Sequence, residues 1–335
     1  MALPGRFADA GHRRADVRAD PRRRARDPSD VEGGSVHNGG TARKAARVRR
    51  AVMAPPRTRT LTRAIRAPPI PTETTMSDAQ ARTALVTGAA RGIGLATATR
   101  FLADGWNVAL LDIDGPGAAA AAERLGRPEA TLAVTADVSD PEAVAAAIQQ
   151  VADRFGRLDA LVNNAGIAIF KPLTETTFAD WSRVLAVNLS GPFLCTQAAV
   201  PLLSERGGAI VNITSISGLR ASTLRTAYGT SKAGLAQLTK QQAAELAQYG
   251  IRVNAVAPGP VDTAMAKAVH SPEIRADYHD AVPLGRYGLE TELAEAIVFL
   301  CSERASYITG QQLAVDGGFE STGIGLKTLR GARNI

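Results

Sequence analysis

The chain is 335 residues long, 45% hydrophobic, and carries a formal net charge of +7. This length and apolar content allow one large domain or two small ones with an ordinary buried core. No run of about 18 or more apolar residues occurs, which argues against a membrane span. Cys195 and Cys301 lie in apolar, helix-like stretches without metal-ligand or redox spacing, so we expect reduced thiols and a cytoplasmic location.

The positive charge is concentrated in residues 1–75. This segment holds 17 of the 39 Lys and Arg residues but only 7 of the 32 Asp and Glu residues, so the remainder is slightly acidic. We therefore expect no nucleic-acid surface on the folded part of the chain. Few large apolar residues recur at helix or strand spacing in this Arg-, Pro- and Ala-rich segment, which predicts disorder.

Several interpretations of residues 1–75 stay open. One is a basic arm that binds nucleic acid or an anionic membrane. A mitochondrial transit peptide should contain few acids, whereas this segment has several, and a secretory signal would need an apolar stretch that it lacks. The interpretation we favour is an inert tail, or a true start at Met76, directly before the first predicted strand.

Residues 78–320 alternate short apolar runs with longer helix-like stretches. The runs predict strands at Ala84–Thr87, Asn107–Asp112, Thr131–Ala136, Leu158–Asn163, Ala209–Thr214, Arg252–Ala257 and Gln312–Val315. The stretches predict helices near 92–104, 116–125, 141–155, 175–204, 227–249 and 290–303. We expect an α/β fold, a doubly wound, mostly parallel Rossmann sheet of about seven strands, with helices on both faces, in one domain at 76–335.

The first predicted strand runs into a glycine-rich turn that a helix follows at once. The turn reads Thr87-Gly88-Ala89-Ala90-Arg91-Gly92-Ile93-Gly94. Glycines let the backbone turn sharply and approach a phosphate, and the helix N-terminus offers free N–H groups to a pyrophosphate. Asp112 ends the second predicted strand, where a carboxylate would accept hydrogen bonds from an adenosine ribose. An ordinary tight turn and a strand-end aspartate are the alternatives.

Four polar residues in the second half of the chain are candidates for catalysis. Tyr228 and Lys232 are four residues apart on a predicted helix, so their side chains can reach one site. A phenol has an unperturbed pKa of about 10, which nearby positive charge lowers toward the range useful for proton transfer. Ser215 follows a predicted strand and could donate to a substrate oxygen or cap a turn. Asn188 interrupts an apolar helical stretch, so its amide must find partners.

The TGxxxGxG turn followed by Tyr-x-x-x-Lys resembles the short-chain dehydrogenase/reductase family, in its branch of roughly 250-residue chains. The resemblance covers about residues 82–320. It implies an oxidoreductase that transfers a hydride between NAD(P) and a secondary alcohol or ketone. It also implies a catalytic tetrad in which Lys232 bonds the nicotinamide ribose and Asn188 holds a water linked to the lysine; its members are Ser215, Tyr228, Lys232 and Asn188.

Further motifs occur in the family's order along the chain. The resemblance implies an adenine contact after the third strand, a cofactor contact after the fourth and a carboxamide contact after the sixth. The residues predicted to bind the cofactor are Thr87, Gly88, Arg91, Gly92, Ile93, Gly94, Asp112, Asp137, Val138, Asn163, Ala165, Gly166, Tyr228, Lys232, Pro258, Gly259, Val261 and Thr263.

Two residues bear on the choice between NAD and NADP. Asp112 would repel a 2′-phosphate, whereas Arg91 could attract it. Ile113 stands where many NADP-using members carry arginine, so we predict NAD, with NADP as the alternative. No metal is expected, because the four histidines have no ligand spacing.

The substrate is predicted only as a small-molecule alcohol or ketone: a polyol, a 3-oxoacyl thioester and a cyclic ketone stay open. The segment 264–283 is predicted to be a lid, and its basic residues could meet a polar or acidic substrate. Relatives imply a homotetramer without membrane or nucleic-acid partners. The alternative function is a non-catalytic protein that senses NAD(P).

Overall fold

A parallel sheet organises residues 80–322, the part of the chain that the computed structural model describes; the segment 1–75 and the C-terminal tail from 323 lie outside the described residues. The strands are β1 (Thr83–Thr87), β2 (Asn107–Asp112), β3 (Thr131–Thr135), β4 (Ala160–Asn163), β5 (Gly208–Ile213), β6 (Ile251–Pro258) and β7 (Gln312–Val315). Their order is β3-β2-β1-β4-β5-β6-β7, and every neighbouring pair is parallel. The doubly wound Rossmann sheet predicted from the sequence is confirmed.

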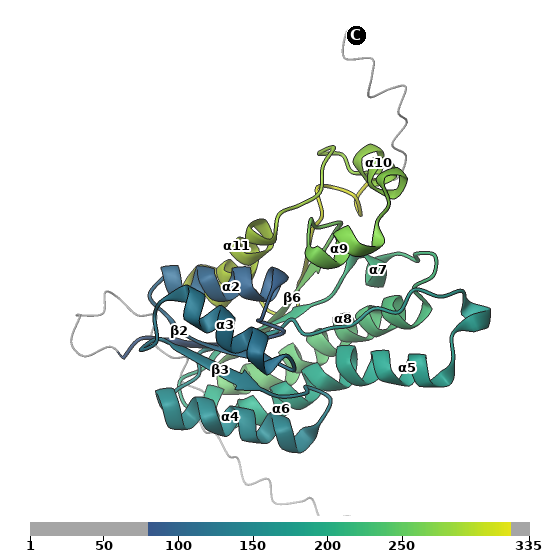
Figure 1. Cartoon of the computed structure of the whole chain (residues 1–335). Coiled ribbons are helices and arrows are strands. Elements are labelled where there is room, and N and C mark those ends of the chain that lie inside the picture. The colour runs from purple at the N-terminus through teal and green to yellow at the C-terminus, as the bar shows by residue number, and fades with distance from the viewer. Residues whose placement is uncertain (1–79, 323–335) are drawn as a thin grey trace, which may run out of the picture. The chain divides into compact units, whose positions relative to one another are not determined.

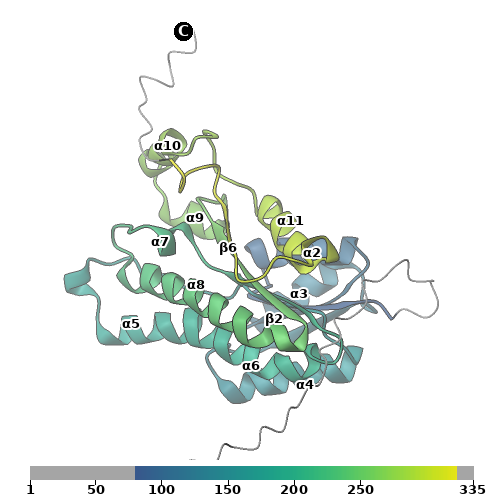
Figure 2. The same cartoon turned by 180° about the vertical axis from the view of Figure 1, so that it is seen from behind.

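Helices cover both faces of the sheet (Figures 1 and 2). One layer contains α2 (Gly92–Ala103), α3 (Gly115–Leu125) and α11 (Glu290–Cys301). The opposite layer contains α4 (Pro141–Phe155), α5 (Phe178–Leu185), α6 (Gly191–Leu203) and α8 (Thr226–Leu246). Three shorter helices follow β5 and β6, namely α7 (Ile216–Leu219), α9 (Ala264–Val269) and α10 (Pro272–Ala281).

Each face of the sheet packs its own apolar cluster, because successive side chains of a strand point to opposite faces. Leu85, Leu161 and Ile210 pack with residues of α4 and α6. Val86 and Val162 pack with residues of α2 and α11 on the other face. Burial on both faces explains why the strands read as nearly continuous apolar runs.

The helix predicted as one unit over 175–204 is interrupted in the structure. A capping box between Thr177 and Asp180 begins α5 only at Phe178, after a short 3₁₀ turn at Leu173–Glu175. A π-helical turn at Ala186–Ser190 then separates α5 from α6. Pro192 has no N–H to donate to the carbonyl of the residue four positions earlier, so regular α-helical bonding fails there.

The run Phe178–Leu203 is the one helical stretch among the described residues whose length and apolar composition would allow it to cross a membrane. Core helices of globular proteins have the same composition. Cys195, Ala199 and Leu203 of this run are buried in the cluster between α4, α6 and the sheet. The apolar composition of this run therefore serves internal packing.

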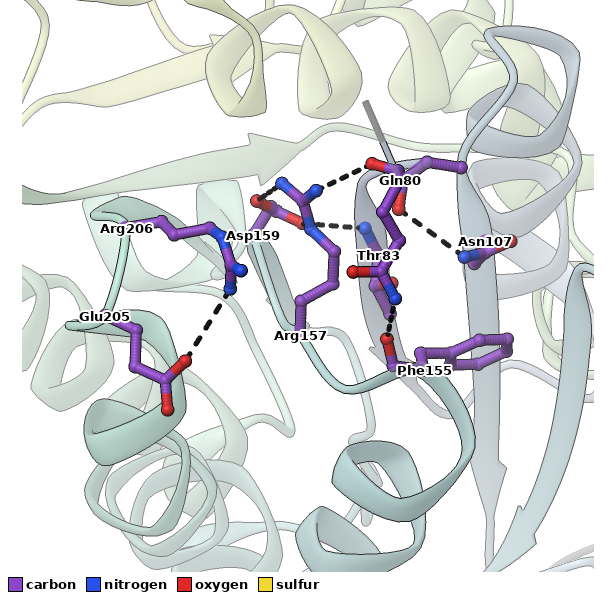
Figure 3. Close-up of polar contacts among 9 residues, drawn as sticks. Gln80, Thr83, Asn107, Phe155, Arg157, Asp159, Glu205 and Arg206 are labelled. Carbon is purple, nitrogen blue, oxygen red and sulfur yellow. Dashed lines mark hydrogen bonds and ion pairs between the residues drawn. The ribbon is translucent and has the colours of Figure 1, made fainter. Parts of the chain in front are cut away.

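An ion pair between Arg157 and Asp159 lies at the end of the sheet where the strands begin (Figure 3). The guanidinium donates from Nε and Nη2 to the two carboxylate oxygens at 2.9 and 2.6 Å. Asp159 Oδ2 also accepts from the backbone N–H of Thr83 at 2.8 Å, and Arg157 donates to the Gln80 carbonyl at 2.6 Å. These contacts fix the starts of β1 and β4 at the edge opposite the site described next.

Candidate active site

A cavity of about 720 Å³ opens at the carboxyl ends of the strands. Its wall is formed by the turns that follow β1 to β6, by the first turns of α8, and by residues of α9 and α10. In open α/β sheets this edge is where ligands bind, because the strand order reverses there and leaves a crevice. The cavity is therefore the candidate active site.

Three of the four predicted catalytic side chains meet on the cavity wall. Ser215 follows β5, whereas Tyr228 and Lys232 lie one turn apart in α8. The Ser215 side chain lies beside the Tyr228 phenol and acts to lower its pKa, and Lys232 Nζ lies 5.8 Å from the centre of the phenol ring. Ser215 also accepts from the backbone N–H of Ser217 at 3.1 Å, so it both caps α7 and faces the phenol.

Burial controls the pKa of the phenol and of the ammonium. Burial raises the pKa of Tyr228, although Ser215 and the charge of Arg225 act in the opposite direction. Burial lowers the pKa of Lys232 to about 8, and its ammonium donates to the Ile213 carbonyl at 2.7 Å. In the chain without a cofactor, burial outweighs the nearby positive charge, so the pKa of Tyr228 lies above its ordinary value. A phenol that keeps its proton can donate it to a carbonyl oxygen.

Asn188 lies in the π-helical turn and is fully buried. Its Oδ1 accepts from the backbone N–H of Ile167 at 2.9 Å, and its Nδ2 donates to the Ile167 carbonyl at 2.9 Å and to Ser231 Oγ at 3.0 Å. A Cβ added to Gly166 would lie 3.3 Å from Asn188 Oδ1 and 3.5 Å from Lys232 Nζ, so amide and ammonium border the same glycine. The side chain thus positions the loop that faces Lys232.

The glycine-rich turn after β1 fits the predicted dinucleotide. Gly88 and Gly92 have φ of +64° and +65°, a region that other residues adopt only with strain. A Cβ on Gly92 would meet only Glu290 Oε1, at 3.8 Å, so the backbone there stands open to an approaching phosphate. The first N–H groups of α2 have no acceptor within the helix and border the cavity at Gly92 and Ile93.

The carboxylate expected to hold the adenosine ribose lies on the cavity wall beyond this turn. Asp112 Oδ2 accepts from the backbone N–H of Ala90 at 3.0 Å, and its Oδ1 accepts from that of Asp114 at 3.0 Å. Ile113, 61% exposed, also lines the cavity. Arg91 lies at the same end, with its side chain 77% exposed and its Nη1 3.9 Å from Asp114 Oδ2.

Asp137, predicted beside the adenine, lines the cavity together with Val138. Its Oδ1 accepts from the Ser139 N–H and hydroxyl at 2.9 and 2.7 Å, and Arg183 Nη2 lies 3.6 Å from its Oδ2. Burial acts to raise the pKa of Asp137, but these hydrogen bonds and the Arg183 charge hold it below its ordinary value. The carboxylate is therefore ionised near neutral pH.

Most of the predicted cofactor residues line the cavity, but three do not. Thr87 is buried, and its hydroxyl accepts from the N–H groups of Asn164 and Ala165 at 3.0 Å each. Asn163 donates to Asn212 Oδ1 at 2.8 Å inside the sheet. Gly94 lets α2 approach the turn, since a Cβ there would lie 2.2 Å from the Gly88 carbonyl. These residues support the cavity wall from behind, and their contact with a cofactor stays a prediction. The predicted residues on the wall are Gly88, Arg91, Gly92, Ile93, Asp112, Asp137, Val138, Ala165, Gly166, Ser215, Tyr228, Lys232, Pro258, Gly259, Val261 and Thr263.

Outside the predicted lid, four polar residues on the wall were not among the predicted site residues, namely Asn164, Arg183, Thr214 and Arg225. Asn164 Nδ2 donates to the carbonyls of Thr87 and Gly88 at 2.9 and 3.0 Å, next to the asparagine that was predicted. Arg225 directly precedes α8, and no motif in the sequence marks it. The predicted lid segment forms α9 and α10 and places His270 and Tyr278 on the cavity wall. Within the described residues, no three His, Cys, Asp or Glu side chains gather to hold a metal.

A glycine-rich dinucleotide cradle at one end of the cavity and a Ser-Tyr-Lys cluster at the other define a nicotinamide-dependent Rossmann oxidoreductase. A family model described as enoyl-(acyl carrier protein) reductase matches residues 88–320. The chain is 41% identical over 242 residues to the 3-oxoacyl-acyl-carrier-protein reductase FabG of Aquifex aeolicus, which covers 71% of this chain and 97% of that protein. An uncharacterized oxidoreductase of Mycobacterium bovis is 43% identical over 240 residues, with 71% and 96% covered.

Solved structures agree with these sequence matches. A protein of Agrobacterium tumefaciens described as a candidate gluconate dehydrogenase has a TM-score of 0.70 and 36% identity, covering 72% of this chain and 97% of its own. The structure of gox2181 has the same TM-score and identity and covers 73% and 97%. The chain belongs to the short-chain dehydrogenase/reductase family. It is accordingly an oxidoreductase that transfers a hydride between NAD(P) and a secondary alcohol or ketone.

Proposed function

We propose that this protein reduces a ketone to a secondary alcohol, with Ser215, Tyr228, Lys232 and Asn188 as its catalytic machinery and NADH as the preferred cofactor. The observation that carries the proposal is the contact between the Ser215 hydroxyl and the Tyr228 phenol on the cavity wall, with the Lys232 ammonium beside the phenol ring. Ser215 comes from the end of a strand and the other two from a helix, so ordinary local structure does not by itself bring them together.

Each residue of this group has its own part in the chemistry. A bound nicotinamide dinucleotide supplies the hydride. Ser215 holds the substrate oxygen by hydrogen bonding, and Tyr228, whose pKa burial raises, donates its proton to that oxygen as charge develops. Lys232 lies within 5.8 Å of the phenol ring and anchors the ribose end of the site. Asn188 positions these groups through the backbone of Ile167 rather than by touching the substrate.

The choice of NADH rests on charge at the adenosine end of the cavity. Asp112 presents a carboxylate there, and a 2′-phosphate placed against it would be repelled in a partly desolvated site. Ile113 adds no positive charge to offset the repulsion. Arg91 would partly offset it, but its side chain is 77% exposed, where solvent screens its charge.

The wider setting of the enzyme is also proposed. We assign residues 76–335 to one catalytic domain, because one sheet runs from β1 to β7 within it. Both cysteines are buried free thiols, which supports a reducing cytoplasmic compartment. Exposed Phe178 and Phe193 on α5 and α6 support self-association, for which a homotetramer is our proposal. The substrate belongs to the class of small alcohols and ketones; relatives bear names of 3-oxoacyl-acyl-carrier-protein reductases and of a gluconate dehydrogenase.

A screen of ketones with NADH and NADPH, followed by nicotinamide absorbance, tests the activity. Tyr228→Phe removes only the proton donor, so turnover should fall by about 10²-fold or more while NADH binding, measured by calorimetry, stays within a few-fold. Full turnover by Tyr228→Phe would reject the proposed mechanism. Tight NADH binding with no turnover of any ketone or alcohol would instead favour a protein that senses the dinucleotide.

A further inference from the structure

The substrate end of the cavity holds a cation that the proposed reaction does not use. Arg225 directly precedes α8, three positions before Tyr228, and both residues line the cavity. The positive charge of Arg225 acts on the Tyr228 phenol in the direction that lowers its pKa. A ligand group bound to Arg225 would therefore lie in the same cavity as a carbon held at Tyr228.

The Arg225 guanidinium is held in place by neutral groups. Nη1 donates to Ser217 Oγ at 3.0 Å, Nη2 donates to the Tyr278 hydroxyl at 3.3 Å, and the guanidinium carbon lies 5.3 Å from the centre of the Phe170 ring. Among residues 80–322, no carboxylate lies within ion-pair distance of Arg225. A guanidinium has five donor hydrogens, so this arrangement leaves donors for a ligand.

The backbone that presents Arg225 is strained. Leu224, directly before it, has φ of +61° and is the only non-glycine residue in the described part of the chain with a positive φ. Its carbonyl accepts from the Lys171 N–H at 3.1 Å, and the Arg225 carbonyl accepts from the Gly229 N–H at 2.7 Å. Such strain persists only where surrounding contacts enforce it, and it concentrates at ligand sites.

The charges around the cavity favour an anion at this end. The acidic residues on its wall, Asp112 and Asp137, both lie at the dinucleotide end. Near Arg225 the wall carries His270 and Tyr278 from the two helices after β6. Burial, with the charges of Arg225 and Arg275, lowers the pKa of His270, so this histidine is uncharged at neutral pH. Arg225 is thus the cation available to a substrate here.

We propose that Arg225 binds the carboxylate of the substrate, which makes the enzyme specific for short oxo or hydroxy carboxylic acids. A planar guanidinium pairs with a carboxylate through two parallel hydrogen bonds, and this geometry fixes the orientation of the rest of the molecule. The bound acid would then present its carbonyl to Ser215 and Tyr228. The inference rests on the proposed function, because it names the substrate of the same site.

The test compares acids with their uncharged esters. Acetoacetate, levulinate and 5-oxohexanoate, each paired with its methyl ester, place the carbonyl at increasing distance from the carboxylate. The full chain is assayed with NADH, and the ratio of kcat/KM for acid over ester is measured for each pair. We expect a ratio above about 10 for at least one pair, and in Arg225→Gln this ratio should fall toward 1, a loss of about tenfold or more. Arg225→Lys, which keeps the charge but not the two-pronged geometry, should give an intermediate ratio.

Arg220 supplies a matched control. Its guanidinium donates to the Phe319 carbonyl at 2.8 Å, lies 4.5 Å from the Phe319 ring centre and does not line the cavity. Arg220→Gln should leave the acid-to-ester ratio unchanged. An equal loss on acid and ester in Arg225→Gln, or failure of wild type to prefer any acid, overturns the inference.

Failure of this inference is distinguishable from failure of the proposed function. Reduction of the esters, or of the neutral N-acetylcysteamine thioester of acetoacetate, in preference to the acids would overturn the carboxylate assignment but leave ketone reduction intact. Full activity of Tyr228→Phe on whichever compound is reduced would remove the proposed function and the inference together.

Discussion

The Asn188 side chain and the Ile167 backbone are joined by a pair of hydrogen bonds, each 2.9 Å long, in which the amide both donates and accepts. The pair links the π-helical turn between α5 and α6 to the loop after β4. Because that loop also contains Gly166, which borders Lys232 Nζ, the asparagine controls the shape of the site at a distance from the reacting atoms.

Asn188→Ala should therefore damage activity and stability together. The change leaves two backbone groups of Ile167 without their partner, which costs about 1–3 kcal/mol of unfolding free energy and about 10- to 100-fold in kcat. Asn188→Asp keeps the acceptor for the Ile167 N–H but places a carboxylate oxygen against the Ile167 carbonyl at a fully buried position, so it should also lose activity and stability. Urea unfolding and steady-state kinetics measure the two effects. Asn107→Ala, at an exposed amide at the start of β2, is the control; a kcat for Asn188→Ala equal to that of this control would contradict the assignment.

Ile113→Arg should move cofactor preference toward NADPH. The residue lines the cavity beside Asp112 and is 61% exposed, so a longer side chain can enter without disturbing the core. A guanidinium there would form charge-assisted hydrogen bonds to a 2′-phosphate, and kcat/KM for NADPH should rise about tenfold. Ile113→Gln adds length without charge and should not produce the rise. A wild type that already favours NADPH would reject the choice of NADH.

Lys232 should make stability depend on pH in the alkaline range. Its pKa is about 8 in the folded chain, against an ordinary value of 10.5 for a solvated lysine, so between these pH values only the unfolded state keeps the proton. Stability therefore rises with pH across that window, by about 3 kcal/mol in total from this group, and the burial cost is fully present below pH 8. The unfolding free energy of wild type relative to Lys232→Met, measured from pH 7 to 10.5, should increase. A constant difference between the two proteins would show that the lysine is not desolvated.

Asp159→Ala should destabilise the fold without changing the chemistry. The Arg157 and Asp159 side chains are only 14% and 11% exposed, so removing one partner leaves a buried charge unpaired and costs about 3–5 kcal/mol. The nearby pair of Arg206 and Glu205, 49% and 56% exposed, is the matched control, and Arg206→Ala should cost less than about 0.5 kcal/mol (Figure 3). Thermal unfolding compares them. Similar losses in the two variants would contradict the difference in burial.

The sequence predicted the sheet well because strand patterns there are strong. All seven predicted strands are present, with ends that differ by no more than a few residues, as at Leu158, where β4 begins only at Ala160. Strand β2 and strand β7 have the predicted bounds. Apolar runs buried on both faces leave little ambiguity about strand position.

The helical regions and the finer roles in the site were harder to predict. The break at Ala186–Ser190 follows from Pro192, a local signal that the apolar helical pattern of 175–204 masked. Thr87 and Asn163 belong to the right motifs, yet their side chains point into the protein's interior to satisfy buried backbone and amide groups. The sequence did not single out Arg225, because only the fold shows which charges surround it.

The contacts of Thr87 and Asn164 have a consequence for how this enzyme can move. The hydroxyl of Thr87 receives two N–H groups from the loop after β4, and the Asn164 amide returns two hydrogen bonds to the turn after β1. The turn after β1 and the loop after β4 flank the reversal of strand order, and these hydrogen bonds hold them together. We predict that opening and closing around a substrate occurs in the segment of α9 and α10, whose His270 and Tyr278 line the same cavity.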